Sequence, residues 1–78
     1  MVIEELERVI LTVPLPEHGL EVGDIGTVVL VHRGGDGYEV EFITLDGKTV
    51  AVVTVLANQI RRIRGGQIAN ARDLKVSA

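Results

Sequence analysis

The sequence contains no cysteine, and its 78 residues include one serine and two histidines. Disulfides and thiolate metal sites are therefore excluded, and a domain this small must be stabilised by its aliphatic core. A serine nucleophile with a fixed base is not expected, because the one serine, Ser77, lies in the C-terminal tail. We expect a protein that is not an enzyme and that uses no cofactor.

The two histidines, His18 and His32, lie far apart in the sequence without the spacing of metal ligands. Glu17 and Glu21 flank His18 and would complete a set of ligands with it. Charged loop side chains are usually solvated, however, and His32 ends an expected strand. No metal site is predicted.

Aromatic residues are scarce, at 3% of the chain, whereas 46% of the residues are hydrophobic. Most of these are Val, Ile and Leu, and β-branched side chains favour strands over helices. No apolar run approaches the ~20 residues that cross a bilayer, and the first residues lack the pattern of a signal peptide. We expect a soluble, cytoplasmic protein with no membrane partner.

Five segments have the pattern of short strands, namely residues 8–13, 26–32, 38–43, 48–55 and 61–64. Glycine-rich turns at residues 33–37 and 46–47 predict hairpins between the second, third and fourth segments. Residues 56–60 fit a single 3₁₀ turn. The fold class predicted from this order is all-β, a small five-stranded SH3-like barrel with a 3₁₀ turn before the last strand.

The predicted barrel spans residues 1–64, and a C-terminal tail follows at residues 65–78. The tail begins with two glycines and carries a weak helical stripe of Ile68, Ala71 and Leu74. Two interpretations remain open for it. It is either a frayed terminus, which is common, or a segment that docks on a partner or on a second copy.

The net charge of −3 conceals an asymmetry between the two parts of the chain. Residues 1–47 contain ten acidic and two basic residues, whereas residues 48–78 contain six basic residues and one acidic residue. The two parts either attract each other within the fold or form an interaction surface with an acidic and a basic region.

The strands at residues 26–32 and 48–55 are apolar on both faces, although only one face of a barrel strand packs in the core. We therefore expect aliphatic side chains on the outside, where such patches mark interfaces. The predicted protein-binding residues are Val29, Val31, Val50 and Val52, together with Glu39 and Glu41 on the polar face of the third strand. A protein partner and a homo-oligomer are expected on this basis.

Nucleic-acid binding, in the manner of a small RNA-binding KOW-like barrel, is the alternative. A basic ridge is predicted from Lys48, Arg61, Arg62 and Arg64. The pattern places both aromatic residues, Tyr38 and Phe42, on the core side, where they cannot stack on bases. The acidic part of the chain also opposes a phosphate backbone, so nucleic acid is the less favoured partner.

Several segments together resemble an uncharacterised family of short bacterial and cyanobacterial proteins, namely residues 15–20, 22–29, 38–42, 46–49 and 56–61. The resemblance covers roughly residues 6–63 and implies an SH3-like barrel of unknown function. Genes of this family are sometimes found beside toxin-like genes. The resemblance therefore implies an antitoxin or immunity role for some members. We expect the protein partner to be a toxin-like protein or an enzyme subunit.

Overall fold

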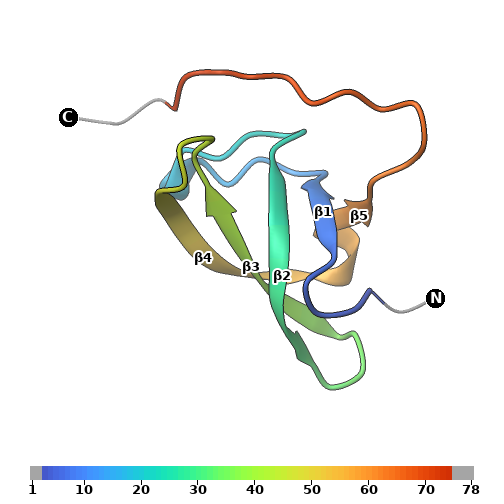
Figure 1. Cartoon of the computed structure of the whole chain (residues 1–78). Coiled ribbons are helices and arrows are strands. Elements are labelled where there is room, and N and C mark those ends of the chain that lie inside the picture. The colour runs from blue at the N-terminus through green and yellow to red at the C-terminus, as the bar shows by residue number, and fades with distance from the viewer. Residues whose placement is uncertain (1–2, 75–78) are drawn as a thin grey trace.

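The structure is a computed structural model that describes residues 3–74, so Ser77 and the end of the predicted tail lie outside the described residues. Within this range the strands are β1 (Arg8–Leu11), β2 (Ile25–His32), β3 (Gly37–Ile43), β4 (Thr49–Leu56) and β5 (Ile60–Arg62). Two 3₁₀ turns, η1 (Pro16–His18) and η2 (Ala57–Gln59), complete the described elements (Figure 1). The predicted all-β fold with a 3₁₀ turn before the last strand is confirmed. None of the helices in the described part is long and apolar enough to span a membrane.

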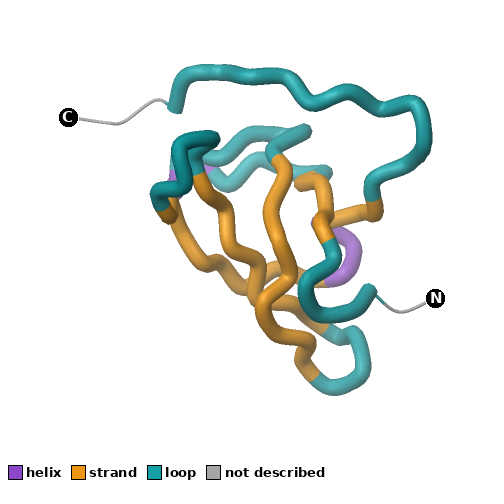
Figure 2. Tube along the Cα trace, viewed as in Figure 1, coloured by secondary structure: helices purple, strands orange, loops and turns teal. Residues whose placement is uncertain are grey.

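All of these strands belong to one antiparallel sheet in the order β4-β3-β2-β1-β5. Hairpins join β2 to β3 and β3 to β4, as the glycine-rich turns predict. The first strand pairs with both β2 and β5, so the two ends of the barrel sequence meet in the sheet. The sheet curls around its own inner face, and η2 links its two outermost strands (Figure 1, Figure 2).

The core lies inside this curl and is entirely apolar. The predicted alternation of β3 is confirmed, since Tyr38, Val40 and Phe42 are buried whereas Glu39 and Glu41 are only partly buried. The other members of the core cluster are Val9, Leu11, Leu20, Val28, Val53, Val55 and Ile60. Among the described residues no polar or charged side chain is buried, so burial of aliphatic surface is the main source of stability.

A β-bulge interrupts the alternation of β2. Val28 and Leu30 pair with successive residues of β3, which leaves Val29 as an extra residue between them. A bulge of one residue reverses the faces of the strand beyond it. Leu30 therefore points outward, and Val31 packs against the core.

A second irregularity occurs in β4. Thr49 and Ala51 pair with successive residues of β3, so Val50 is the extra residue there. Val50 therefore packs partly against the core and does not point outward like Val52. Both irregularities lie in valine-rich segments, where inward-facing and outward-facing positions cannot be told apart from the sequence.

The loop between β1 and β2 folds back onto β1. The backbone N–H of Leu11 donates to the carbonyl of Asp24 at 2.9 Å, and Leu20 is buried in the core. Val22, two residues further along the loop, is exposed. The loop therefore presents the side chains of Glu21 and Asp24 near one end of the barrel.

The tail runs without helix or strand from Gly65 to the last described residue and crosses that end of the barrel (Figure 1, Figure 2). A helix does not form on its apolar stripe, because so short an isolated segment cannot offset the entropy of helix nucleation. Arg72 forms an ion pair with Asp24 of the β1–β2 loop at 2.5 Å. The tail is thus attached to its own barrel, which neither interpretation of the sequence anticipated.

Candidate functional site

The face of β2, β3 and β4 that points away from the core, called here the outer face, brings acidic and aliphatic residues together. The strand register aligns them in two rows across the sheet, Leu30–Glu39–Thr54 and Thr27–Glu41–Val52. The aliphatic end residues are about half exposed, with Leu30 at 46% and Val52 at 52%. Each row therefore has a carboxylate in its middle, on β3, and an aliphatic side chain at one end.

The Glu39 carboxylate is held by neighbours on two strands. The Thr54 hydroxyl donates to Glu39 Oε2 at 2.6 Å, and His32 Nε2 lies 2.7 Å from the same oxygen. The hydrogen bond from Thr54 and then that from His32 hold the pKa of Glu39 below its ordinary value. Glu39 is therefore an oriented and charged acceptor at neutral pH.

Glu41 is oriented in the same way, one row further along the sheet. The Thr49 hydroxyl donates to Glu41 Oε2 at 2.7 Å. Glu39 and Glu41 thus each accept a hydrogen bond from a threonine of β4, which lies beside them in the sheet. The threonines of β4 are functional neighbours that the sequence analysis missed, because β-branched residues are common in any strand and do not stand out there.

Replacing Thr54 by valine is expected to raise the pKa of Glu39 toward its ordinary value of 4.5, because the Thr54 hydroxyl is the main cause of the lowering. A carboxyl-carbon NMR titration measures this change. The lowered pKa stabilises the folded state above about pH 4.5, and this contribution is lost as the pH falls through the folded-state pKa. Thr49→Val, which removes the donor to Glu41, is the control and should leave Glu39 unchanged. An unaltered Glu39 titration in Thr54→Val contradicts this assignment.

The aliphatic part of the outer face differs from the predicted set. Val29 and Val52 are exposed as predicted. Val31 and Val50 were expected to share their face, but both are packed against the core because of the two bulges. Leu30 takes the exposed position beside Val29, and Leu56 is exposed near the end of β4. The bulges could not be read from the sequence, so Leu30 was missed.

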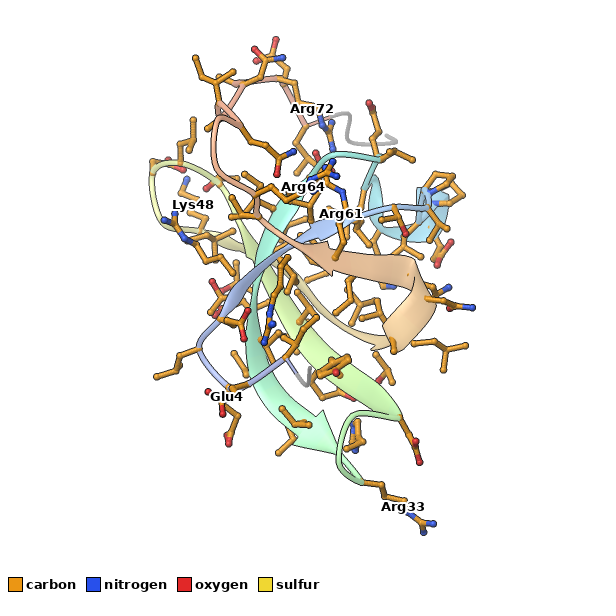
Figure 3. All side chains as sticks on the ribbon, turned by 90° about the vertical axis from the view of Figure 1, so that its right-hand side faces the viewer. Glu4, Arg33, Lys48, Arg61, Arg64 and Arg72 are labelled. Atoms are coloured by element: carbon orange, nitrogen blue, oxygen red, sulfur yellow. The ribbon has the colours of Figure 1, made fainter. Side chains whose placement is uncertain are left out.

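The predicted basic ridge is divided in the structure. Arg62 directs Nε and Nη2 to the Glu7 carboxylate at 2.7 and 3.1 Å. This contact lowers the pKa of Glu7 and raises that of Arg62, so Arg62 is engaged in tying β5 to the N-terminal segment. Arg61 and Arg64 lie toward the tail, whereas Lys48 lies apart from them in the β3–β4 turn (Figure 3).

The loop histidine does not gather a ligand set. His18 ends η1, and Glu21 lies 3.4 Å from Arg72 Nη1 in an ion pair. Within residues 3–74, no group of three or more His, Asp or Glu side chains is placed to hold a metal ion.

Comparison with known proteins identifies a family. Its model covers residues 5–62, which include every strand from β1 to β5 and end before the tail. No protein of curated function and no solved structure matches the chain. The match agrees with the extent of the resemblance seen in the sequence, and the chain belongs to the family described as "Domain of unknown function (DUF4926)".

Proposed function

We propose that the chain is a non-catalytic protein-binding module and that the outer face of β2–β4 is its binding surface. The observation that carries the proposal is the pair of exposed aliphatic side chains, Leu30 and Val52, that flank two oriented carboxylates. Exposed Val29 and Leu56 extend the aliphatic area along β2 and β4. Exposed aliphatic side chains next to polar groups are typical of a protein interface.

The proposed partner presents basic side chains among aliphatic ones. Glu39 and Glu41 are already oriented by hydrogen bonds from Thr54 and Thr49, so little side-chain order must be gained when a cation binds. Arginine fits such a surface best, because its fork pairs with carboxylates and its stem packs on aliphatic groups. The acidic side chains then set the register of the complex, and Leu30 and Val52 supply the apolar contact.

Within this proposal the partner is a toxin-like protein or an enzyme subunit that the chain neutralises or regulates. The family resemblance supports this class of partner through the toxin-like gene neighbours described above. The same face could also bind a second copy of the chain, and burial of its aliphatic side chains would then help to stabilise a small core. Light scattering at low micromolar concentration measures this self-association.

The double substitution Leu30→Asp and Val52→Asp is expected to weaken partner binding about tenfold or more, because buried aliphatic contacts of this kind contribute about 1 kcal/mol or more each. Capture of the partner from a lysate of the source cells by the tagged full chain, followed by titration calorimetry with the purified partner, measures it. Leu45→Asp is the matched control, since Leu45 is exposed in the β3–β4 turn, away from the outer face.

Retention of full binding by the double variant contradicts the proposal, provided that its circular dichroism matches that of the wild type. The nucleic-acid alternative is tested in the same preparation with a single-stranded RNA oligonucleotide at low salt. RNA binding that falls with salt and is lost in an Arg61→Ala, Arg64→Ala variant would replace the proposed function with the alternative.

A further inference from the structure

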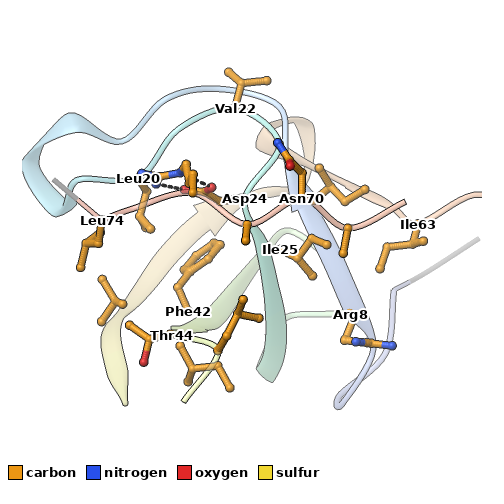
Figure 4. A pocket seen from close by; sticks show the side chains of 18 of the residues that line it. Arg8, Leu20, Val22, Asp24, Ile25, Phe42, Thr44, Ile63, Asn70 and Leu74 are labelled. Carbon is orange, nitrogen blue, oxygen red and sulfur yellow. Dashed lines mark hydrogen bonds and ion pairs between the residues drawn. The ribbon is translucent and has the colours of Figure 1, made fainter. Parts of the chain in front are cut away.

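The tail lies over a hollow at one end of the barrel. This hollow is separate from the outer face, since neither Glu39 nor Glu41 lines it. The hollow has a volume of about 1200 Å³ and is lined by aliphatic side chains that include Ile25, Ile43 and Ile63. Figure 4 shows the tail passing above Ile25 and Phe42 with the β1–β2 loop on its other side. The lining is therefore shared between the barrel and the tail.

Arg72 anchors the tail at its far end. Its Nε and Nη2 donate to the two carboxylate oxygens of Asp24 at 2.9 and 2.5 Å, and Nη2 also donates to the Gly19 carbonyl at 3.0 Å. The side chains are largely covered, with 27% of Arg72 and 18% of Asp24 exposed. Burial raises the pKa of Asp24, but the hydrogen bonds from Arg72 and Glu21 outweigh it and lower the pKa below its ordinary value. This anchor is a forked, charge-assisted contact of the strong kind.

Gln67 anchors the near end of the tail. Its Oε1 accepts hydrogen bonds from the backbone N–H of Arg64 at 2.6 Å and from Arg61 Nη1 at 3.0 Å. Gly65 and Gly66 lie directly before it, with no atom near enough to pack on an added side chain, and Gly66 has a positive φ of 83°. The link between barrel and tail is thus short, open and able to turn.

The stretch between the anchors contributes little apolar packing. Residues 68–71 are exposed, and Ile68 is 92% exposed despite its aliphatic side chain. The tail is therefore held by its polar ends and does not fill the hollow below it. A segment attached in this way can leave without disrupting the core, which contains no tail residue.

We propose that residues 67–74 form an exchangeable strap, and that the tail of a second copy of this chain docks over the same hollow with its Arg72 on Asp24 of the first copy. A second copy fits this site because the Asp24 carboxylate and the Gly19 carbonyl already bind the tail of the same chain, and the same bonds can form between two chains. Exchange of an identical terminal element across an open hinge is a low-cost route to a dimer. The charges agree, because residues 1–47 are strongly acidic and the tail supplies a cation.

Two complementary variants of the full chain test the exchange. Arg72→Ala keeps the Asp24 site but lacks the anchor, whereas Asp24→Asn keeps Arg72 and its ion pair with Glu21 but lacks the carboxylate that accepts the forked pair of hydrogen bonds. Neither variant alone is expected to dimerise through its tail, because neither contains an intact Arg72–Asp24 pair to share. The 1:1 mixture is expected to form a heterodimer, seen by native mass spectrometry and as shifted amide signals of Asp24 and Ile25 in labelled Arg72→Ala protein.

A peptide of residues 64–74 separates docking of the tail from folding of the second variant. Added to labelled Arg72→Ala protein, it is expected to shift the same signals, and the peptide with alanine at position 72 is expected not to. The titration extends to about 1 mM, the effective concentration that a short linker gives the tail within one chain. Absence of shifts with both the Asp24→Asn chain and the arginine peptide overturns the proposal. Equal shifts from both peptides also overturn it, because Arg72 would then not be the recognised group.

Discussion

Replacing Leu11 by alanine is expected to lower the free energy of unfolding by about 2–5 kcal/mol. Leu11 ends β1, is fully buried, and belongs to the core cluster that every strand contributes to. Its backbone also joins the sheet to the β1–β2 loop, through the bonds with Asp24 and Gly23. The substitution leaves a cavity at a place where this loop and two strands converge, so the surroundings have little freedom to collapse into it.

Urea or thermal denaturation followed by circular dichroism measures this loss. For a domain of this size, each kcal/mol lowers the melting temperature by about 4–8 °C, so the variant is expected to be partly unfolded under conditions in which the wild type is folded. Leu45→Ala is the matched control, because Leu45 is almost fully exposed and the same chemical change there should stay within about 0.5 kcal/mol. Equal stability of the two variants would show that β1 is not at the centre of the core.

Replacing Gly26 by alanine is expected to cost about 1–3 kcal/mol of stability through overpacking. A Cβ at Gly26 would lie 2.5 Å from Val40 Cγ1, 2.9 Å from Phe42 Cε1 and 3.0 Å from the Glu41 carbonyl oxygen. These distances are shorter than the ~3.5 Å at which carbon atoms attract one another. Glycine is therefore required here by the close approach of β2 and β3, and not by a left-handed backbone.

Gly65→Ala is the control, since nothing lies near an added methyl group there, and its stability should match that of the wild type. A Val40→Ala background adds a second test, because it removes the closest obstacle. The loss caused by Gly26→Ala should be smaller in that background than in the wild type. Full additivity of the two changes would contradict the packing of Gly26 under Val40.

The strands and turns of this protein could be predicted because their signals are local. In β3 the apolar residues Tyr38, Val40 and Phe42 alternate with acids, and only one choice of faces buries them. The turns that flank β3 contain glycines that adopt positive φ, among them Gly34 and Gly47. The order of these elements was sufficient to predict the all-β architecture and the 3₁₀ turn before the last strand.

The candidate site could be predicted only in part. Glu39, Glu41, Val29 and Val52 were placed on the surface by composition and alternation, and the structure has them there. Val31 and Val50 were assigned to the same surface because β2 and β4 were counted as unbroken strands. The position of a bulge depends on how two strands are paired across the sheet, and a run of valines carries no record of it.

By itself, the sequence determined an aliphatic, all-β chain with acidic and basic parts, because composition, two-residue periodicity and turn residues act over a few neighbouring positions. Only the tertiary structure decided which aliphatic side chains are exposed and where the charges meet. Arg72 and Asp24 are 48 residues apart, and the curl of the sheet with the fold of the β1–β2 loop brings them together. Such a contact is set by strand register and by the path of the chain. Both depend on the packing of the whole core and not on the two residues that make the contact.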